Sequence, residues 1–307
     1  AESLSPGSIA AAGLATGAVV LVLGLTGLVE TIDRLVPRPV VRGIQLGVGL
    51  KLLVKGIDLI RQTQPLALDG WLTAAAGAGV VLLASRRPRF PSALVLFAAG
   101  IAVMAAVRPE LLGHLPAGWN GLHLVIPSAA EWETGIVRGA VPQLPLTLLN
   151  SVIAVCALSE DLYPGRGAGT RKMAASVGLM NVLGCWLGAM PMCHGAGGLA
   201  GQHRFGARTG GAVVMLGIAK MAVGVAFGAS AGLLLAAYPL SILGVLLAFA
   251  GIELALPARE CREREPFFVA VLTAGGCLGF NTAVGVLLGL GAAALMRART
   301  SAGKPVV

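Results

Sequence analysis

The sequence predicts an all-α polytopic membrane protein, on the basis of its composition and of its long uncharged stretches. Hydrophobic residues make up 56% of the 307 residues, and charged residues make up 12%. Soluble domains carry about 25% charged residues, so most side chains here are not suited to water. The stretches 173–203, 221–252 and 266–296 contain no Lys, Arg, Asp or Glu. Because about 20 residues cross a hydrocarbon core as a helix, each stretch is long enough to span a membrane.

The apolar stretches predict the order of the spans. Full spans are expected at 8–29, 39–60, 69–85, 91–107, 136–158, 173–190, 209–227 and 229–256. The stretch 191–204 combines a proline, a Cys-His pair and several glycines, which predicts an interrupted half-crossing with a short helix near 195–204. The stretch 266–296 is too long for one untilted helix, and Gly279–Thr282 is expected to divide it into a hairpin of two short helices.

Lys and Arg divide unequally between the two faces that these spans define. One set of loops holds Arg34, Arg38, Arg86, Arg87, Arg89, Arg166, Arg171, Lys172, Arg204, Arg208, Arg259, Arg262, Arg264, Arg297, Arg299 and Lys304. The opposite set holds Arg61, Arg108 and Arg138. The positive-inside rule places the first set, and with it the C-terminus, in the cytoplasm. The net charge of +9 therefore indicates membrane topology and not a nucleic-acid partner.

The domain organisation is predicted from the longest polar connection, 108–135. We expect it to be an external linker between a first half, 1–107, and a second half, 136–297, which a cytoplasmic tail, 298–307, follows. An ordinary loop is an equally good interpretation of the connection. The tetrapeptide Gly-Ala-Val-Val occurs at 17–20 and at 211–214. Together with interrupted helices, this echo favours the internal duplication that is common in secondary transporters.

Small residues recur four apart, as at Gly13 and Gly17 and at Gly43 and Gly47. In membranes this spacing lets helix backbones approach closely, although a general bias toward glycine is an alternative explanation. Lys220 and Glu253 are charges within spans. They are expected to pair with each other, to gate a pathway, or to reach the interface by snorkelling.

The first candidate site is a polar interruption of the span 136–158. Pro142 and Pro145 lack backbone donors, and the polar side chains of Gln143, Thr147 and Asn150 lie at membrane depth. A kinked helix whose polar groups bond to neighbouring helices is the structural alternative.

The second candidate site lies where an extended stretch meets the predicted short helix. Its residues are Cys193, His194, Gly195, Ala196, Gly197 and Gly198. The first N–H groups of a helix have no partner within it, and they carry about half a unit of positive charge. Such a helix start is suited to binding an anion, and glycine lets the anion approach closely.

Other interpretations of the second segment remain. Gly197 and Gly201 are spaced for helix packing, His194 suits an oxyanion donor, a titrating group or a helix cap, and Cys193 suits packing better than nucleophilic attack. The glycine spacing is not that of a nucleotide-binding turn, and the histidines lack the spacing of a zinc site. We expect no enzymatic activity, metal or cofactor, because no acid–base pair appears within the spans.

Two segments of the sequence resemble signatures of the molybdate transporters related to sulfate permeases. The first is PQLPLTLLNSVIAVC at 142–156 followed by LSEDLYP at 158–164, and the second is GAMPMCHGAGGLAGQHRFGAR at 188–208. The resemblance extends over essentially the whole chain. It implies an inverted-repeat fold of about seven plus seven segments in which two broken helices face each other near the midplane. The resemblance also implies three further segments of the first repeat, with the other site motif, ahead of residue 1, so we interpret the sequence as N-terminally truncated relative to the family.

The sequence and the resemblance together predict uptake of a tetrahedral oxyanion, molybdate, across the plasma membrane. The expected partners are molybdate and the lipid bilayer, and the oligomeric state stays open, with a homodimer as one alternative. Sulfate or another anion is the alternative substrate, and the different class is a non-transporting membrane subunit.

Overall fold

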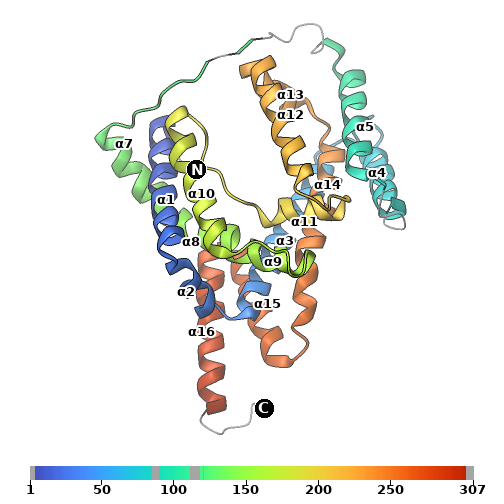
Figure 1. Ribbon diagram of the computed structural model, residues 1–307. Coiled ribbons are helices and arrows are strands. Elements are labelled where there is room, and N and C mark those ends of the chain that lie inside the picture. The colour runs from blue at the N-terminus through green and yellow to red at the C-terminus, as the bar shows by residue number, and fades with distance from the viewer. Residues whose placement is uncertain (1–3, 85–89, 111–117, 120, 302–307) are drawn as a thin grey trace. The chain divides into compact units, whose positions relative to one another are not determined.

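The computed structural model describes residues 4–84, 90–110, 118–119 and 121–301. Apart from an isolated bridge between Gln64 and Gly70, the regular elements in these residues are helices (Figure 1). The chain divides into two compact units, and each combines segments that are far apart in the sequence. Unit 1 contains 1–50, 122–199 and 254–307, and unit 2 contains 51–121 and 200–253.

The helices of unit 1 are α1 (Pro6–Thr26), α2 (Leu28–Leu35), the first half of α3 (Arg38–Arg61), α7 (Ala129–Thr134), α8 (Val141–Leu148), α9 (Val155–Leu162), α10 (Thr170–Gly184), the start of α11 (Ala196–Arg204), α15 (Arg264–Gly279) and α16 (Thr282–Ser301). Unit 2 contains the remainder of α3 and α11, together with α4 (Trp71–Ala84), α5 (Ser92–Val107), α12 (Gly211–Phe227), α13 (Ala231–Ala237) and most of α14 (Leu240–Ala255). Wider π turns lie at Gly135–Ala140 (η1) and Leu149–Ala154 (η2), and 3-10 turns lie at Cys185–Leu187 (η3), Gly228–Ser230 (η4) and Leu256–Glu260 (η5).

Glycines bring α1 and α10 into direct contact along their length (Figure 1). A Cβ added at Gly17 would lie 2.7 Å from the Cβ of Asn181, and one added at Gly24 would lie 2.6 Å from the backbone nitrogen of Ala175. Both distances are shorter than real Cβ contacts. The predicted close approach of helices at the Gly13–Gly17 step is therefore present in unit 1.

A second glycine step brings α3 against α15. A Cβ at Gly43 would lie 2.5 Å from the Cβ of Thr273, and one at Gly47 would lie 2.7 Å from the Cβ of Cys277. The helices α15 and α16 form the expected hairpin, since α15 ends at Gly279 and α16 begins at Thr282 (Figure 1).

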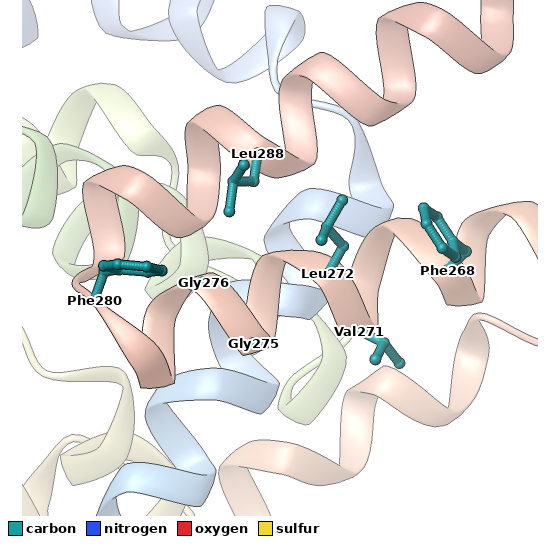
Figure 2. A pocket seen from close by; sticks show the side chains of 7 residues that line it. All are labelled: Phe268, Val271, Leu272, Gly275, Gly276, Phe280 and Leu288. Atoms are coloured by element: carbon teal, nitrogen blue, oxygen red, sulfur yellow. The ribbon is translucent and has the colours of Figure 1, made fainter.

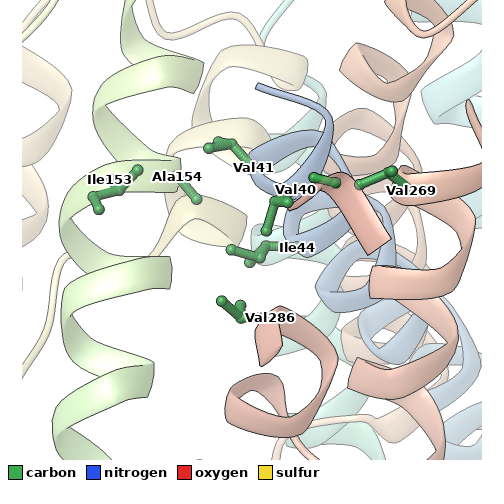
Figure 3. Packing of buried hydrophobic residues seen from close by; sticks show 8 residues of the cluster. Val40, Val41, Ile44, Ile153, Ala154, Val269 and Val286 are labelled. Carbon is green, nitrogen blue, oxygen red and sulfur yellow. The ribbon is translucent and has the colours of Figure 1, made fainter. Parts of the chain in front are cut away.

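The apolar core of unit 1 contains two clusters of buried side chains. Figure 3 shows the first, which joins α3, η2, α15 and α16 through Val40, Val41, Ile44, Ile153, Ala154, Val269, Val286 and Ala293. The second joins α1, α2, η2 and α10 through Val20, Val29, Val152, Ala174 and Val177. Both clusters include residues of η2, so the helix that carries the first candidate site is fixed from two sides.

The prolines of the first candidate site do not break their helix. Helix, π turn and helix follow one another from Ala129 to Leu162, and Pro142 and Pro145 lie within α8 between the two π turns. We attribute the first of these wider turns, η1, to Pro142, since its missing N–H leaves the carbonyl of residue 138 without its helical partner. The helix begins at Ala129, earlier than the expected 136, because Ser128 and Glu131 form a capping box.

The single span expected at 229–256 is wrong. The helix α13 is bent by 115° from α12, and α14 begins only at Leu240, after Pro239. Proline disfavours helical conformation in the residue before it, and Tyr238 is accordingly extended, with φ −65° and ψ 138°. Likewise, the first span ends at Thr26 and not at 29, because Gly27 adopts φ +77°.

By length and apolar character, three helical stretches of the described residues can cross a membrane: Pro6–Thr26, Ala129–Leu162 and Leu240–Glu260. The bent pair α12 and α13 would add a fourth. The spans expected at 69–85 and 91–107 correspond to the shorter apolar helices α4 and α5.

Candidate functional site

The second candidate site lies where the chain is not helical. After η3, residues 189–195 form no regular element, and α11 then begins at Ala196. Irregular backbone at membrane depth must satisfy its polar groups through the protein itself. The neighbouring helix α10 provides those partners.

The side chain of Asn181, on α10, binds both backbone polar groups of Met192. Its Oδ1 accepts a hydrogen bond of 2.7 Å from the amide of Met192, and its Nδ2 donates one of 2.7 Å to the carbonyl of the same residue. The second Nδ2 hydrogen is donated to the carbonyl of Val177 at 2.8 Å. Asn181 is only 2% exposed, so this arrangement replaces contacts that water would otherwise make.

A second hydrogen bond holds the stretch two residues further on. The Nε2 atom of His194 lies 3.1 Å from Oγ of Ser176, which is also on α10. Asn181 and Ser176 are separated by about 7.5 Å along a helix that rises about 1.5 Å per residue. Two extended residues span about 6.6 Å, so Met192–His194 follows α10 in extended form toward its N-terminus.

The extended stretch Met192–His194 is followed by Gly195 and then by α11, which begins at Ala196. The carbonyl of Gly195 accepts the first helical hydrogen bond, from the amide of Leu199 at 3.1 Å. The N–H groups that precede Leu199 have no partner inside the helix. A Cβ added at Gly198 would meet no atom within 4 Å, and one added at Gly195 would make only an ordinary contact of 3.8 Å. Packing therefore does not require glycine at these two positions, and the space beside the amides is open.

The remaining residues of this segment differ in their surroundings. Ala196 is fully buried, Gly197 is half-buried, and Cys193 has an exposed thiol. The packing interpretation holds for Gly201, because a Cβ there would lie 3.0 Å from the Cβ of Ala250 in unit 2. In α11, therefore, the space beside Gly198 is open, whereas Gly201, one turn further on, is packed against α14.

The first candidate site lies in unit 1 as well. Nε2 of Gln143 donates to Oγ1 of Thr147 at 3.4 Å, and Thr147 is 3% exposed. Within the described residues, Oδ1 of Asn150 is buried without a hydrogen-bond partner. Rotation of that amide by 180° would place an N–H donor in the same position. The bond between Gln143 and Thr147 lies within α8 and does not involve the second candidate site. In that second site, His194 is bonded to Ser176 of α10.

The common neighbour of the two segments is α10. Its residue Val177 packs with Val152 of η2, and Leu144 and Leu148 of α8 pack against the same cluster. The same helix carries the residues that hold the extended stretch: Ser176, next to Val177, and Asn181, one turn further on. Sequence reasoning missed Ser176 and Asn181, although a signal exists: they are polar residues within an uncharged apolar span.

The expected pairing of Lys220 with Glu253 is wrong. In unit 2, Oε1 of Glu253 lies 3.7 Å from Nδ1 of His203, and Lys220 is exposed on α12. The contact of Gly201 with Ala250 brings α11 against α14, which places His203 rather than Lys220 beside the carboxylate.

A pocket of about 410 Å³ lies along α15 and α16 (Figure 2). Its lining consists of Phe268, Val271, Leu272, Gly275, Gly276, Phe280 and Leu288. These side chains offer an oxyanion no hydrogen-bond donor, so the pocket does not suit the predicted substrate. In the part of the chain that the structure describes, no three His, Cys, Asp or Glu side chains gather as a metal site would require.

The fold is that of a helical membrane transporter. The structure resembles the transmembrane domain of a cyanobacterium bicarbonate transporter, BicA, with a TM-score of 0.59 and 16% identity over 94% of this chain and 76% of that one. It also resembles SLC26A9, with a TM-score of 0.62 and 12% identity over 94% of this chain and 50% of that one. At such identities the resemblance defines the fold and not the substrate.

The sequence places the chain in a particular family. Residues 1–52 and 135–254 match the family described as "Molybdate transporter of MFS superfamily". The chain is 39% identical to Molybdate transporter 2 of Arabidopsis thaliana over 97% of its own length and 73% of the relative's. It is 37% identical to Molybdate transporter 1 of the same plant, over 94% and 72%. The chain therefore belongs to the molybdate transporter family, as the two signature segments predicted, and its relatives are named transporters and not enzymes.

Proposed function

We propose that this protein transports molybdate across a membrane. The support for the substrate is family membership, together with two relatives named molybdate transporters that match nearly the whole chain. Molybdate is a tetrahedral dianion at neutral pH, so its carrier must replace hydration with hydrogen-bond donors and positive potential. The first turn of α11 offers both.

The proposed binding site is the N-terminal turn of α11, at Gly195–Gly198. The observation that carries this assignment is the open space beside amides that have no helical partner, at the end of a stretch held by α10. One helix start supplies about half a unit of positive charge, so a dianion needs more donors. In this proposal His194, Gln143, Thr147 and Asn150 provide side-chain contacts.

The transport cycle in this proposal follows from an inverted-repeat fold. Its support is the fold similarity to BicA and SLC26A9, the internal echo of Gly-Ala-Val-Val, and the helical interruption at 189–195. Rocking or sliding of one helical unit against the other would give alternating access. The positive-inside rule supports a cytoplasmic C-terminus. In this proposal the carrier lies in the plasma membrane, alone or in a homodimer.

The test is uptake of labelled molybdate, with and without excess sulfate, in cells that express the chain. The decisive variant is Gly198→Leu, whose side chain would fill the open space beside the amides. Its matched control is Gly217→Leu on α12, where an added Cβ also meets no atom within 4 Å. We expect Gly198→Leu to abolish saturable uptake and Gly217→Leu to retain it. Equal uptake by the two variants would remove the site, and uptake that sulfate suppresses as well as molybdate does would remove the selectivity.

A further inference from the structure

The side-chain amide of Asn181 holds the backbone of Met192 on both sides, through its N–H and its carbonyl oxygen. Its two N–H groups are donated to the carbonyls of Met192 and Val177, and its Oδ1 accepts from the amide of Met192 and from Sγ of Cys185 at 3.9 Å. The Cβ of Asn181 packs directly against Gly17 of α1, where an added Cβ would lie only 2.7 Å away. The side chain of Asn181 therefore has little room to move. A buried amide of this kind fixes the backbone that it binds in one orientation.

The orientation of that backbone sets the direction of the helix that follows. Only Cys193, His194 and Gly195 separate Met192 from the first residue of α11. Ser176 holds His194, so the chain is bound on both sides of Cys193 before the helix begins. A shift at Met192 would therefore be passed directly to the amides of Gly195–Gly198.

We propose that Asn181, with Ser176 as a second anchor, is a positioning residue that sets the affinity of the anion site. The inference rests on the proposed function, because it assumes that the first turn of α11 binds the substrate. Asn181 itself does not touch the anion. It keeps the donors aimed at one point, and preorganised donors bind an anion more tightly than mobile ones do.

The first test compares the kinetics of molybdate uptake in Asn181→Leu with those in Asn281→Leu. Leucine has the same branching at Cγ as asparagine, lacks its hydrogen-bonding atoms and is tolerated in lipid. Asn281 caps α16 by accepting a 3.0 Å bond from the amide of Val284, so its loss removes a helix cap and leaves the bonds between α10 and Met192–His194 in place. We expect Asn181→Leu to raise KM by about 10-fold, the effect of losing about 1.4 kcal/mol of hydrogen bonding. Asn281→Leu should lower Vmax, through abundance, with KM unchanged.

The second test measures the stretch directly, through Cys193. Its thiol is exposed, whereas Cys156, Cys185, Cys261 and Cys277 are buried, so a maleimide added to folded protein in membranes labels Cys193 first. We expect Asn181→Leu to raise the labelling rate several-fold, and molybdate to slow labelling in the wild type. Ser176→Ala, which loses a single bond at the partly exposed end, should show both effects more weakly.

The outcomes separate the two proposals. A wild type that neither takes up molybdate nor gains protection at Cys193 would overturn the proposed function and with it the effect on affinity, and the labelling rates would still decide whether Asn181 holds the stretch in place. Normal wild-type uptake with unchanged KM and unchanged labelling in Asn181→Leu would overturn the positioning role alone. If Asn181→Leu does not reach the membrane, the same two measurements are made on Ser176→Ala. A KM and a Cys193 labelling rate equal to those of the wild type would then refute the inference.

Discussion

The guanidinium group of Arg42, on α3, binds the carboxylate of Asp161, at the end of α9, through both Nη atoms. The Nη2–Oδ1 distance is 2.8 Å, and the side chain of Arg42 is only 6% exposed. Glu260 of η5 completes the cluster at 2.7 Å from Nη2, and Oε1 of Gln45 accepts from Nη1 at 3.0 Å. A buried cation thus joins three segments of unit 1 that are far apart in the sequence.

We expect Asp161→Ala to destabilise the protein by about 3–5 kcal/mol, because it leaves a buried arginine without its bidentate partner. Glu260→Ala should cost less, since the side chain of Glu260 is 53% exposed and water can replace it. The measurement is the fraction of detergent-solubilised protein that remains monodisperse after heating. If the two variants lost equal stability, the bidentate pair would not be the main interaction.

Close packing of α1 on α10 predicts that Gly24→Ala is destabilising. The new Cβ would lie 2.6 Å from the backbone nitrogen of Ala175, and a helix backbone cannot move aside cheaply. We expect a loss of about 1–3 kcal/mol in the same heating assay. The control is Gly217→Ala, where the Cβ meets open space and alanine's higher helix propensity should leave stability unchanged or raised. A Gly24→Ala variant as stable as this control would contradict the observed packing.

The carboxylate of Asp69 caps a helix that is remote from it in sequence. Its two oxygens accept hydrogen bonds from the amides of Leu240 and Ser241, at 3.0 and 2.9 Å, where α14 begins. Asp69→Ala should therefore cost about 1 kcal/mol, as for other N-cap aspartates, and Asp69→Asn should cost less. Asp58→Ala on α3 serves as the control for removal of a carboxylate from unit 2. Protection of α14 amides from hydrogen exchange should fall only in the Asp69 variants, and unchanged protection would show that the cap is dispensable.

If Thr147 contributes a donor to the anion, Thr147→Val should raise KM for molybdate by about 5- to 10-fold, equivalent to one hydrogen bond of about 1 kcal/mol. Its matched control is Thr273→Val on α15. Thr273 is equally buried, and its hydroxyl is already donated to the carbonyl of Val269 at 2.7 Å. That variant should change abundance without changing KM. A KM that Thr147→Val leaves unaltered would limit the site to α11 and its immediate neighbours.

The sequence predicted those features that depend on local composition. Long uncharged stretches gave the helical membrane class, and the Gly13–Gly17 and Gly43–Gly47 steps indicated where helices approach closely. The proline and glycines at 191–201 indicated a broken helix, because proline lacks a backbone N–H and glycine has a low helix propensity. The signature segments at 142–164 and 188–208 gave the family, since short-range order along the chain is all that a signature requires.

The tertiary structure decided which groups meet. Arg42 is a charge near the end of an apolar stretch, and nothing near it in sequence indicates Asp161 or Glu260 as its partners. The same holds for Glu253, which approaches His203 instead of Lys220, and for Asn181, whose partner Met192 lies beyond a helix end. Hydrophobic periodicity reports how each helix is oriented relative to lipid and core, whereas hydrogen bonds and ion pairs depend on the register between helices. That register is fixed by packing at positions such as Gly17 and Gly24, and it exists only in the folded chain.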